Sequence, residues 1–288
     1  ELLEAGRDVV VADNLETGFR AAIPDGVRFY EGSICDRQFL NELFENEKID
    51  GVVHFAANSQ VGESMKNPLK YYQNNLYGTM ILMESMVKYK INKIVFSSTA
   101  AVYGEPESIP VEECARTEPT NCYGETKLSV EKMLRWVSEA HGLHFVVLRY
   151  FNACGAHPSG RIGEAHYPET HLIPLVMQVA NGQRESISVF GNDYPTPDGT
   201  CIRDYVHVCD LAQAHILALE WIESDKGNEI FNLGNGIGFS VMEVIDEIRR
   251  VTGHPIPAVL HHRRRGDPAR LVASGVKAKD ELGWEPKY

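Results

Sequence analysis

Short apolar runs, each closed by polar or small residues, recur along the first half of the chain. They lie at residues 9–12, directly before Asp13, and at residues 49–57, 93–99 and 144–152. A continuous apolar run of this length is typical of a strand that is buried on both faces of a parallel sheet. The pattern therefore predicts a set of buried parallel strands.

Amphipathic stretches lie between these runs. They predict helices at residues 38–47, 71–89 and 124–140, and in the last of these the apolar positions roughly follow the 3.6-residue period. A further helix is predicted for the first five residues, with Gly6 as its stop. Alternation of strands and helices predicts an α/β fold with a doubly wound, Rossmann-like parallel sheet.

Charge and composition exclude several partners. The formal charge of −12 disfavours nucleic acid or an anionic membrane surface, because the field of the whole protein repels phosphates. No run approaches the roughly 18 apolar residues of a membrane-spanning helix. The six cysteines include no Cys-x-x-Cys pair, so we expect reduced thiols, a cytoplasmic location and no structural metal.

Two further clusters contain side chains of the kinds that bind a metal ion or a phosphate. His166, Glu169 and His171 resemble a metal-ligand set, and we interpret them as structural or substrate contacts. The basic run "HHRRRGD" at residues 261–267 fits a clamp for a diphosphate better than a nucleic-acid surface on a chain of this acidity.

Two Tyr-x-x-x-Lys patterns occur, and their placement separates them. Ligands of open parallel sheets bind beyond the carboxyl ends of the strands. Tyr89 and Lys93 straddle a helix end and a strand start, at the opposite edge, and are interpreted as solvated surface. Tyr123 and Lys127 begin a helix, where four-residue spacing puts both on one face, and the preceding strand ends at Thr99.

This trio suggests proton chemistry at an alcohol. A free phenol has a pKa near 10, and a cation within about 4–6 Å lowers such a pKa by about 1–3 units. We therefore expect Lys127 to make Tyr123 a usable base, with the Thr99 hydroxyl orienting the reacting alcohol. The alternative is a helix start that carries these residues by chance.

The residues now carry a family resemblance. The Ser/Thr…Tyr-x-x-x-Lys arrangement resembles the extended short-chain dehydrogenase/reductase superfamily. The strings "EPTNCYGETK" (118–127), "RYFNACGAHPSGRIGE" (149–164) and "FGNDYPTPDGTCIRDYVHVCDLA" (190–212) resemble the UDP-glucose 4-epimerase family. The likeness covers essentially the whole chain. It implies an NAD-binding domain at residues 1–152, without its first strand and glycine turn, and a smaller C-terminal α/β domain for the UDP-sugar at residues 153–288.

The resemblance also implies roles for single residues. Tyr123 is the catalytic acid/base, Lys127 tunes it and holds the nicotinamide ribose, and Thr99 bonds the sugar hydroxyl. Asp13 takes the adenosine ribose diol, which favours NAD over NADP. The other implied cofactor positions are Asn14, Ile34, Phe55, Ala56, Ala57, Asn74 and Tyr150. The implied UDP positions are Asn152, Leu172, Val189, Phe190, Arg203, Arg264 and Asp267.

The implied reaction interconverts UDP-galactose and UDP-glucose through a transient 4-keto sugar and tightly bound NAD. Dimerisation through residues 71–89 and 124–140 is expected by the same likeness, and acceptance of N-acetylated sugars depends on the cavity near Leu271. A nucleotide-sugar 4,6-dehydratase is an alternative, but it usually has an Asp-Glu pair directly after the threonine, where Ala100 and Ala101 stand here. A non-catalytic nucleotide-sugar-binding or dimerisation module is a second alternative.

The family opens with a strand and a Gly-x-x-Gly-x-x-Gly turn that cradles the pyrophosphate, and the sequence contains no such turn. The family also continues beyond "LGWEPKY", so we expect a chain clipped at both ends. Ser33 stands where a family aspartate usually meets the adenine.

Because of these departures from the family pattern, we predict weak NAD binding by the 288-residue chain. Calorimetric titration with NAD measures it, and tight stoichiometric binding would overturn the prediction.

Overall fold

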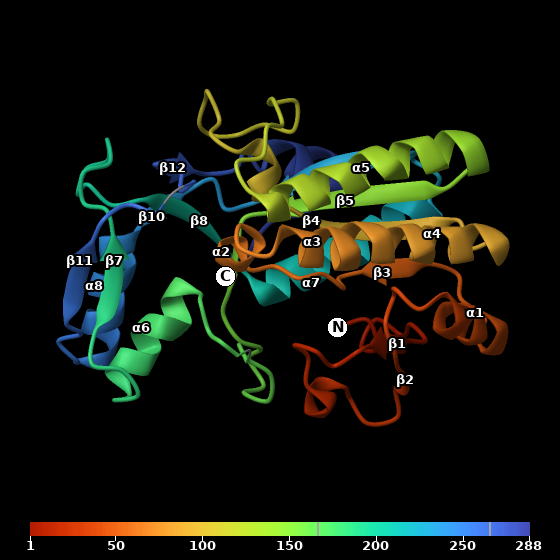
Figure 1. Cartoon of the computed structure of the whole chain (residues 1–288), viewed down its shortest axis with the longest axis horizontal. Coiled ribbons are helices and arrows are strands. Elements are labelled where there is room, and N and C mark those ends of the chain that lie inside the picture. Colours follow the sequence, from red (N-terminus) through yellow and green to blue (C-terminus); the bar gives the residue numbers. More distant parts are fainter. Residues whose placement is uncertain (166, 265) are drawn as a thin grey trace.

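The central sheet is parallel throughout. The computed structural model describes residues 1–165, 167–264 and 266–288. Its sheet has the order β3-β4-β5-β9, formed by β3 (Val52–His54), β4 (Lys93–Thr99), β5 (His144–Tyr150) and β9 (Glu229–Leu233). A second parallel pair, β1 (Val10–Asp13) with β2 (Arg28–Glu31), packs against the same core (Figure 1). The predicted strands are present, and the predicted doubly wound parallel sheet is confirmed.

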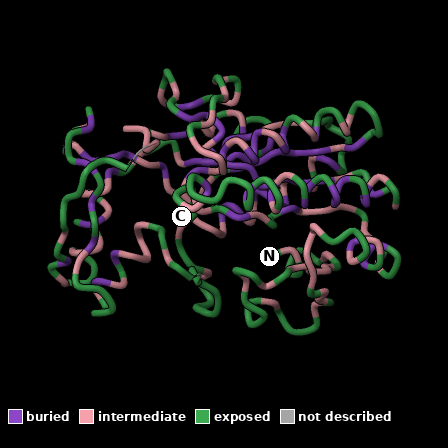
Figure 2. Tube along the Cα trace, in the orientation of Figure 1, coloured by how far each residue is buried: buried purple, intermediate pink, exposed green. Residues whose placement is uncertain are grey.

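Helices cover both faces of this sheet. They are α1 (Arg37–Asn46), α4 (Thr79–Lys88), α5 (Cys122–His141) and α7 (Val208–Glu223). In β4, Ile94 and Phe96 join the core under α1, α4 and α5, whereas Val95 joins the core under α7. That alternation follows from the two-residue period of a strand. Burial is concentrated in these strands and on the inner sides of α4 and α5, as Figure 2 shows.

The predicted helix at residues 71–89 is interrupted. The segment consists of α3 (Pro68–Tyr71), a π-helix η2 (Tyr72–Gly78) and α4. Within η2, Asn75 Oδ1 accepts from the Asn58 N–H at 2.8 Å, and Asn75 Nδ2 donates to the Asn58 carbonyl at 3.0 Å and to Thr126 Oγ1 at 3.1 Å. Apolar periodicity cannot distinguish a π turn from an α turn, whereas these long-range bonds accompany the change of pitch.

The first residues form hydrogen-bonded turns instead of the predicted helix. The Ala5 N–H donates to the Glu1 carbonyl at 2.8 Å, and Gly6 follows with a φ of +74°. A stretch this short closes too few backbone bonds to offset the cost of helix nucleation.

The second half of the chain adds a smaller α/β layer, seen on the left in Figure 1. Its centre is β8 (Ile202–His207), which pairs with β6, β10 and β12, while β7 and β11 pair in parallel against α6 and α8. The bounds of these elements are β6 (Asn152–Cys154), β7 (Ile187–Phe190), β10 (Gly238–Ser240), β11 (Ala258–His261), β12 (Arg270–Leu271), α6 (Leu172–Ala180) and α8 (Val241–Thr252). The short elements are α2 (Val61–Ser64), η1 (Arg20–Ala22), η3 (Ala100–Tyr103) and η4 (Ala278–Leu282).

The domain division at residue 152 stays a prediction, and the chain path adds a detail to it. Strand β9 pairs with β5, and α7 packs on β4 and β5, although both elements follow residue 152. The sheet of the first half therefore draws on residues of the second half. Within the parts of the chain described above, no helix combines the length and the apolar character needed to cross a membrane.

The start of α5 packs directly on η3. A Cβ on Gly124 would lie 2.5 Å from the Ala101 carbonyl oxygen and 3.2 Å from Pro119 Cβ. Only glycine permits this approach without moving the helix. The glycine of "YGETK" therefore sets how close Tyr123 comes to the end of β4.

Gly124→Ala is expected to lower the free energy of unfolding by about 1–3 kcal/mol, because the added methyl forces α5 away from η3. Urea denaturation measures the change. The control is Gly62→Ala, since a Cβ on Gly62 in α2 meets no atom within 4 Å. Equal effects of the two substitutions would contradict the close approach at Gly124.

Candidate active site

Helix α5 begins at a polar cap. Asn121 has an extended backbone, and its Oδ1 accepts a hydrogen bond from the Gly124 N–H at 2.8 Å. Such a cap satisfies a backbone donor that the first helical turn leaves open. Tyr123 is thereby the second residue of the helix, and its N–H donates to Ser64 Oγ of α2 at 3.2 Å.

Lys127 follows Tyr123 by one helical turn on the same face, as predicted. Its Nζ lies 5.9 Å from the centre of the Tyr123 ring and donates to the Ser97 carbonyl of β4 at 2.8 Å. Thr99 is the last residue of β4, and its side chain lies close enough to the Tyr123 phenol to act on the pKa of that group. The structure therefore brings the three predicted residues together at the carboxyl end of β4.

The protonation states differ from the expectation. Burial raises the pKa of Tyr123 above its ordinary value near 10, a charge on Tyr150 would add to the rise, and the Thr99 side chain acts against it. Burial also lowers the pKa of Lys127 to about 7, against the attraction of Glu131. The expected lowering by Lys127 is wrong for this structure, because a buried lysine is only partly charged at neutral pH and its Nζ bonds the Ser97 carbonyl.

One consequence concerns the direction of proton transfer. Tyr123 is a proton donor at neutral pH in this structure. It accepts a proton only when a further positive charge lies close to the phenol, since nearby opposite charge favours the ionised form.

Sequence reasoning missed a buried ion pair behind the trio. Glu131, one turn beyond Lys127, accepts from Arg149 Nε at 3.0 Å, from Arg149 Nη2 at 2.5 Å and from Ser98 Oγ at 2.5 Å. Arg149 Nη1 also donates to the Tyr103 hydroxyl at 2.9 Å. Charges this deeply buried persist only when they are paired and hydrogen-bonded. A glutamate four residues after Lys127, on the buried side of a predicted helix, was the signal available in the sequence.

The predicted cofactor residues follow the carboxyl ends of several strands. Asp13 ends β1, and its Oδ1 accepts from the Leu15 N–H at 2.7 Å. A Cβ on Gly18 would lie 3.1 Å from the same oxygen, so the chain curls closely around this carboxylate. The other predicted positions are Asn14 after β1, Ile34 after β2, Phe55, Ala56 and Ala57 after β3, Asn74 in η2 and Tyr150 at the end of β5.

An unsatisfied donor at this edge supports a dinucleotide. Asn58, which sequence reasoning did not single out, follows Ala57 and is 8% exposed, and its Nδ2 has no hydrogen-bond partner among the described residues. A buried donor left unpaired costs about 1–3 kcal/mol, which a ligand acceptor would remove. Phe55 lies three residues before it and is 59% exposed. The residues present therefore fit NAD, whose phosphate and ribose oxygens are acceptors.

Several predicted substrate residues meet in the smaller layer. Asp267 Oδ2 lies 2.9 Å from Arg264 Nε, and Asp267 Oδ1 lies 3.9 Å from Arg203 Nη2. The Arg264 guanidinium lies 5.0 Å from the centre of the Phe190 ring. Arg203 also donates to the Pro268 carbonyl at 2.8 Å. Asp267 thus lies next to both arginines. These are the two arginines that we expected to bind a diphosphate.

The remaining predicted substrate residues occupy other parts of that layer. Val189 of β7 is buried, and Leu172 at the start of α6 packs against the same apolar cluster. Asn152 begins β6 and is aligned with Tyr205 of β8. The described contacts do not join Asn152 to the arginine cluster.

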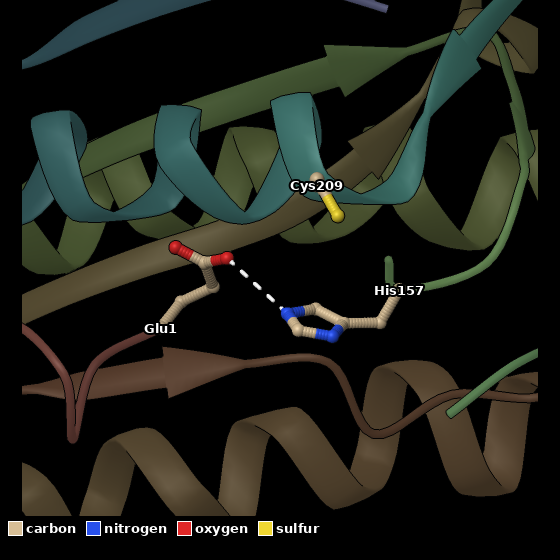
Figure 3. A group of neighbouring side chains, drawn as sticks. All are labelled: Glu1, His157 and Cys209. Atoms are coloured by element: carbon tan, nitrogen blue, oxygen red, sulfur yellow. Dashed lines mark ion pairs between the residues drawn. The ribbon is translucent and has the colours of Figure 1, made fainter. Parts of the chain in front are cut away.

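A group of side chains with metal-like composition lies elsewhere. Figure 3 shows Glu1, His157 and Cys209, which line a pocket of about 190 Å³. The Ser159 N–H donates to His157 Nδ1 at 3.2 Å, while His157 Nε2 lies 3.8 Å from Glu1 Oε1. With Nδ1 accepting, the ring proton lies on Nε2, so the ring presents a donor and not the lone pair of a metal ligand. None of the predicted site residues lines this pocket.

A second group comprises Glu164, Glu169 and His171. Glu169 Oε1 accepts from the backbone N–H groups of Thr170 at 2.6 Å and of His171 at 2.7 Å. This carboxylate caps its own loop, which agrees with the structural interpretation of the segment. His166, part of the predicted spacing, lies outside the described residues.

The second Tyr-x-x-x-Lys pattern lies at the opposite edge of the sheet, as predicted. Tyr89 directly follows α4, and Lys93 is the first residue of β4. The Tyr89 ring is half-buried, however, with its centre 6.0 Å from that of Phe44, and its hydroxyl bonds Glu45. The interpretation as solvated surface is therefore wrong for the Tyr89 ring, which packs on the core.

Known proteins resemble this chain along its whole length. The NAD dependent epimerase/dehydratase family model matches residues 1–234. The UDP-glucose 4-epimerase of Halalkalibacterium halodurans is 60% identical over 100% of this chain and 86% of that protein. The crystal structure of UDP-glucose 4-epimerase from Brucella ovis in complex with NAD has a TM-score of 0.96 and 45% identity, with coverage of 100% of this chain and 88% of that one. The crystal structure of UDP-glucose 4-epimerase from Bifidobacterium longum in complex with NAD⁺ and UDP has a TM-score of 0.94 and 42% identity. The match covers 100% of this chain and 88% of that one.

Lys127→Met is expected to remove a pH dependence of stability. The unfolded chain keeps the lysine proton up to the ordinary pKa of 10.5, whereas the folded protein keeps it only up to about 7. Between these values the unfolded state binds more protons, so the free energy of unfolding of the wild type rises with pH. The free energy of unfolding of the variant minus that of the wild type should therefore fall across this window, by on the order of a few kcal/mol.

Chemical denaturation at a series of pH values measures this difference. Lys132→Met, which changes an exposed lysine of the same helix, is the control. A pH-independent difference between Lys127→Met and the wild type would show that burial does not perturb Lys127.

Proposed function

Since the chain belongs to the NAD dependent epimerase/dehydratase family, we propose that it interconverts UDP-galactose and UDP-glucose by inverting C4 of the hexose. The observation that carries this proposal is the meeting of Thr99, Tyr123 and Lys127 at the carboxyl end of β4. The full-length similarity to proteins named UDP-glucose 4-epimerase supports the same reaction.

Tyr123 is the group that exchanges a proton with the 4-hydroxyl. Its phenolate takes the hydroxyl proton as the sugar becomes a 4-keto sugar, and the phenol returns that proton after the hexose has turned its other face. Thr99, close to the phenol, orients the 4-hydroxyl. NAD, when bound, would supply the hydride acceptor and donor for C4, together with a positive charge when oxidised. That charge offsets the burial that otherwise keeps Tyr123 protonated.

The cofactor lies, in this proposal, along the carboxyl edge of the parallel strands. The Asp13 carboxylate takes the adenosine ribose diol, and Lys127 reaches the nicotinamide ribose. Asn58 Nδ2 donates to an oxygen of the dinucleotide, which satisfies the buried donor that otherwise has no partner among the described residues. Phe55 and Tyr150 provide aromatic surfaces at the same edge.

The smaller layer holds the UDP portion. Arg203 and Arg264, prearranged by Asp267, present guanidinium donors to the diphosphate. Firm binding of UDP with few contacts to the hexose allows the 4-keto sugar to turn within the site. The division into a cofactor half and a substrate half, near residue 152, is part of this proposal.

The alternative dehydratase reaction has less support. It needs acid and base groups next to the trio to expel water, whereas buried Ala100 and half-buried Ala101 continue from Thr99 into η3. Leu271, at the end of β12, is half-buried against the cluster under η3, and we keep N-acetylated UDP-hexoses as a second substrate class to be assayed.

We also propose a homodimer formed through α4 and α5. Met80 on α4 is 38% exposed and Trp136 on α5 is 70% exposed, so large apolar side chains lie on helices that the monomer leaves partly uncovered. Sedimentation velocity measures the oligomeric state, and a monomer at all concentrations would exclude this interface.

Tyr123→Phe should reduce the conversion of UDP-galactose to UDP-glucose by about a hundredfold to ten-thousandfold, because the phenol supplies the transferred proton. A coupled assay with saturating NAD measures the rate. Tyr89→Phe is the matched control, since Tyr89 opens the other Tyr-x-x-x-Lys pattern, and it should retain the wild-type rate. Undiminished conversion by Tyr123→Phe would remove Tyr123 from the mechanism.

A further inference from the structure

A fully buried carboxylate lies where the parallel sheet meets the smaller layer. Asp204 of β8 is 0% exposed. Its Oδ1 accepts from the Asn235 N–H at 2.8 Å, and its Oδ2 accepts from the N–H groups of Gly236 and Ala273, both at 3.1 Å. A buried carboxylate persists only where donors surround it, and these three backbone groups supply them. The proposed mechanism assigns no task to Asp204.

Two of the three donors come from the sheet that carries the trio. Asn235 and Gly236 lie just after β9. The last residue of that strand, Leu233, is aligned with Tyr150 of β5, and Tyr150 is aligned with Thr99 of β4. Neighbouring strands lie about 4.8 Å apart, so β9 ends about 10 Å from Thr99 in the same row of the sheet. The bonds to Asn235 and Gly236 thus tie β8 to the carboxyl edge of the sheet.

The third donor leads to the start of α5. Ala273 belongs to the apolar cluster that contains Ala100 and Tyr103 of η3. The same η3 touches α5, because a Cβ on Gly124 would lie 2.5 Å from the Ala101 carbonyl oxygen. The bond from the Ala273 N–H therefore ties β8 to the contact on which the first turn of α5 rests.

On its other side, Asp204 directly follows an arginine of the diphosphate clamp, by which we mean Arg203, Arg264 and Asp267. Contacts inside the clamp do not pass through Asp204. Arg203 Nη1 donates to the Pro268 carbonyl at 2.8 Å, and Arg264 Nε lies 2.9 Å from Asp267 Oδ2. The clamp is thus held together by its own contacts, and Asp204 links it to the sheet.

We propose that Asp204 is a positioning residue, whose carboxylate fixes the distance from the diphosphate clamp to Tyr123, so that C4 of a bound UDP-hexose comes within reach of the phenol. This inference rests on the proposed function for the identity of the substrate. The bonds between the diphosphate and C4 set the span of that substrate, and the protein has to match it. A misplacement of about 1 Å costs on the order of a hundredfold in rate.

Close packing leaves this junction little freedom to shift. A Cβ on Gly234 would lie 2.5 Å from Asp204 Oδ2 and 2.4 Å from Ala273 Cβ. Any larger residue at position 234 therefore has to move the carboxylate or Ala273. Packing of this density transmits a displacement to its neighbours, so a change at the junction reaches the elements on both sides.

Asp204→Asn tests the role of the carboxylate, because it keeps the shape of the side chain and replaces one oxygen with an NH₂ group. That group only donates, so at least one of the three N–H groups loses its acceptor. The kcat for UDP-galactose at saturating NAD, per UDP-binding site, should fall by about tenfold to a hundredfold. The Kd of UDP alone should stay within about twofold of the wild type, because the clamp keeps its own contacts.

Calorimetric titration with UDP gives both the Kd and the number of binding sites, so unfolded molecules do not count as lost kcat. The matched control is Asp210→Asn in α7. Asp210 is 3% exposed, and its carboxylate accepts from the N–H groups of Lys287 at 2.9 Å and Tyr288 at 3.1 Å, away from the junction. It should keep the wild-type kcat. Equal falls of kcat in the two variants, or a UDP Kd that weakens in step with kcat in Asp204→Asn, would overturn the inference.

Gly234→Ala disturbs the same junction and leaves the carboxylate in the protein. Its added methyl should lower kcat per UDP-binding site and leave the Kd of UDP unchanged, as in Asp204→Asn. Wild-type kcat in a folded Gly234→Ala protein would show that the position of the junction does not matter, and it would overturn the inference.

Hydrogen exchange measured by NMR examines the junction without turnover, and it keeps the inference testable should Asp204→Asn not fold. In the wild type the three amides that donate to Asp204 should be protected, and exchange as fast as in exposed amides would overturn the inference. In Asp204→Asn at least one of them should exchange faster, while the Ile202 amide, which bonds the Ala269 carbonyl at 2.9 Å, should stay protected. Equal acceleration at Ile202 would indicate general loosening and would also overturn the inference.

Activity separates this inference from the proposed function. If the function is wrong, the wild type does not convert UDP-galactose, and the exchange pattern alone decides whether Asp204 fixes the clamp to the sheet. If the function is right and the inference is wrong, the wild type and Asp204→Asn convert UDP-galactose equally fast per UDP-binding site.

Discussion

The site depends on a buried lysine side chain, that of Lys127, which is held away from water against a strand carbonyl. The bond from Lys127 Nζ to the Ser97 carbonyl joins α5 to the carboxyl end of β4 and places Tyr123 beside Thr99. Burial of this group disfavours its charge, so the arrangement persists only because the surrounding structure fixes it. The Asn121 cap and the close approach at Gly124 are parts of that support.

Buried polar groups around the trio have the same purpose of fixing positions. Glu131 accepts from Ser98 and Arg149, and its charge is satisfied by a two-pronged bond from the arginine. Asn75 ties the loop after β3 to α5 through Asn58 and Thr126. Each network joins elements that are far apart in sequence, so the orientation of the trio is a property of the whole sheet and its covering helices.

The ligand-facing edge is, by contrast, incomplete in its own bonds. Asn58 has a buried amide nitrogen without a partner among the described residues, and Phe55 is largely exposed although it is aromatic. Such unsatisfied groups cost stability in the free protein and become favourable contacts when a ligand with acceptor oxygens binds. Stability and binding are therefore in opposition along this edge, as is usual for a preformed site.

The sequence by itself determined the parallel strands, the span of α5 and the placement of Thr99, Tyr123 and Lys127 at the carboxyl end of β4, because strand burial, helical period and four-residue spacing are local properties of a chain. The sequence also placed Tyr89 and Lys93 at the amino ends of the strands, opposite to the edge where ligands of parallel sheets bind. Only the tertiary structure decided the π turn at residues 72–78, the ion pair of Glu131 with Arg149 and the protonation of Tyr123 and Lys127. These features arise where segments from distant parts of the chain exclude water together, and desolvation of that kind has no signature in any short stretch of sequence.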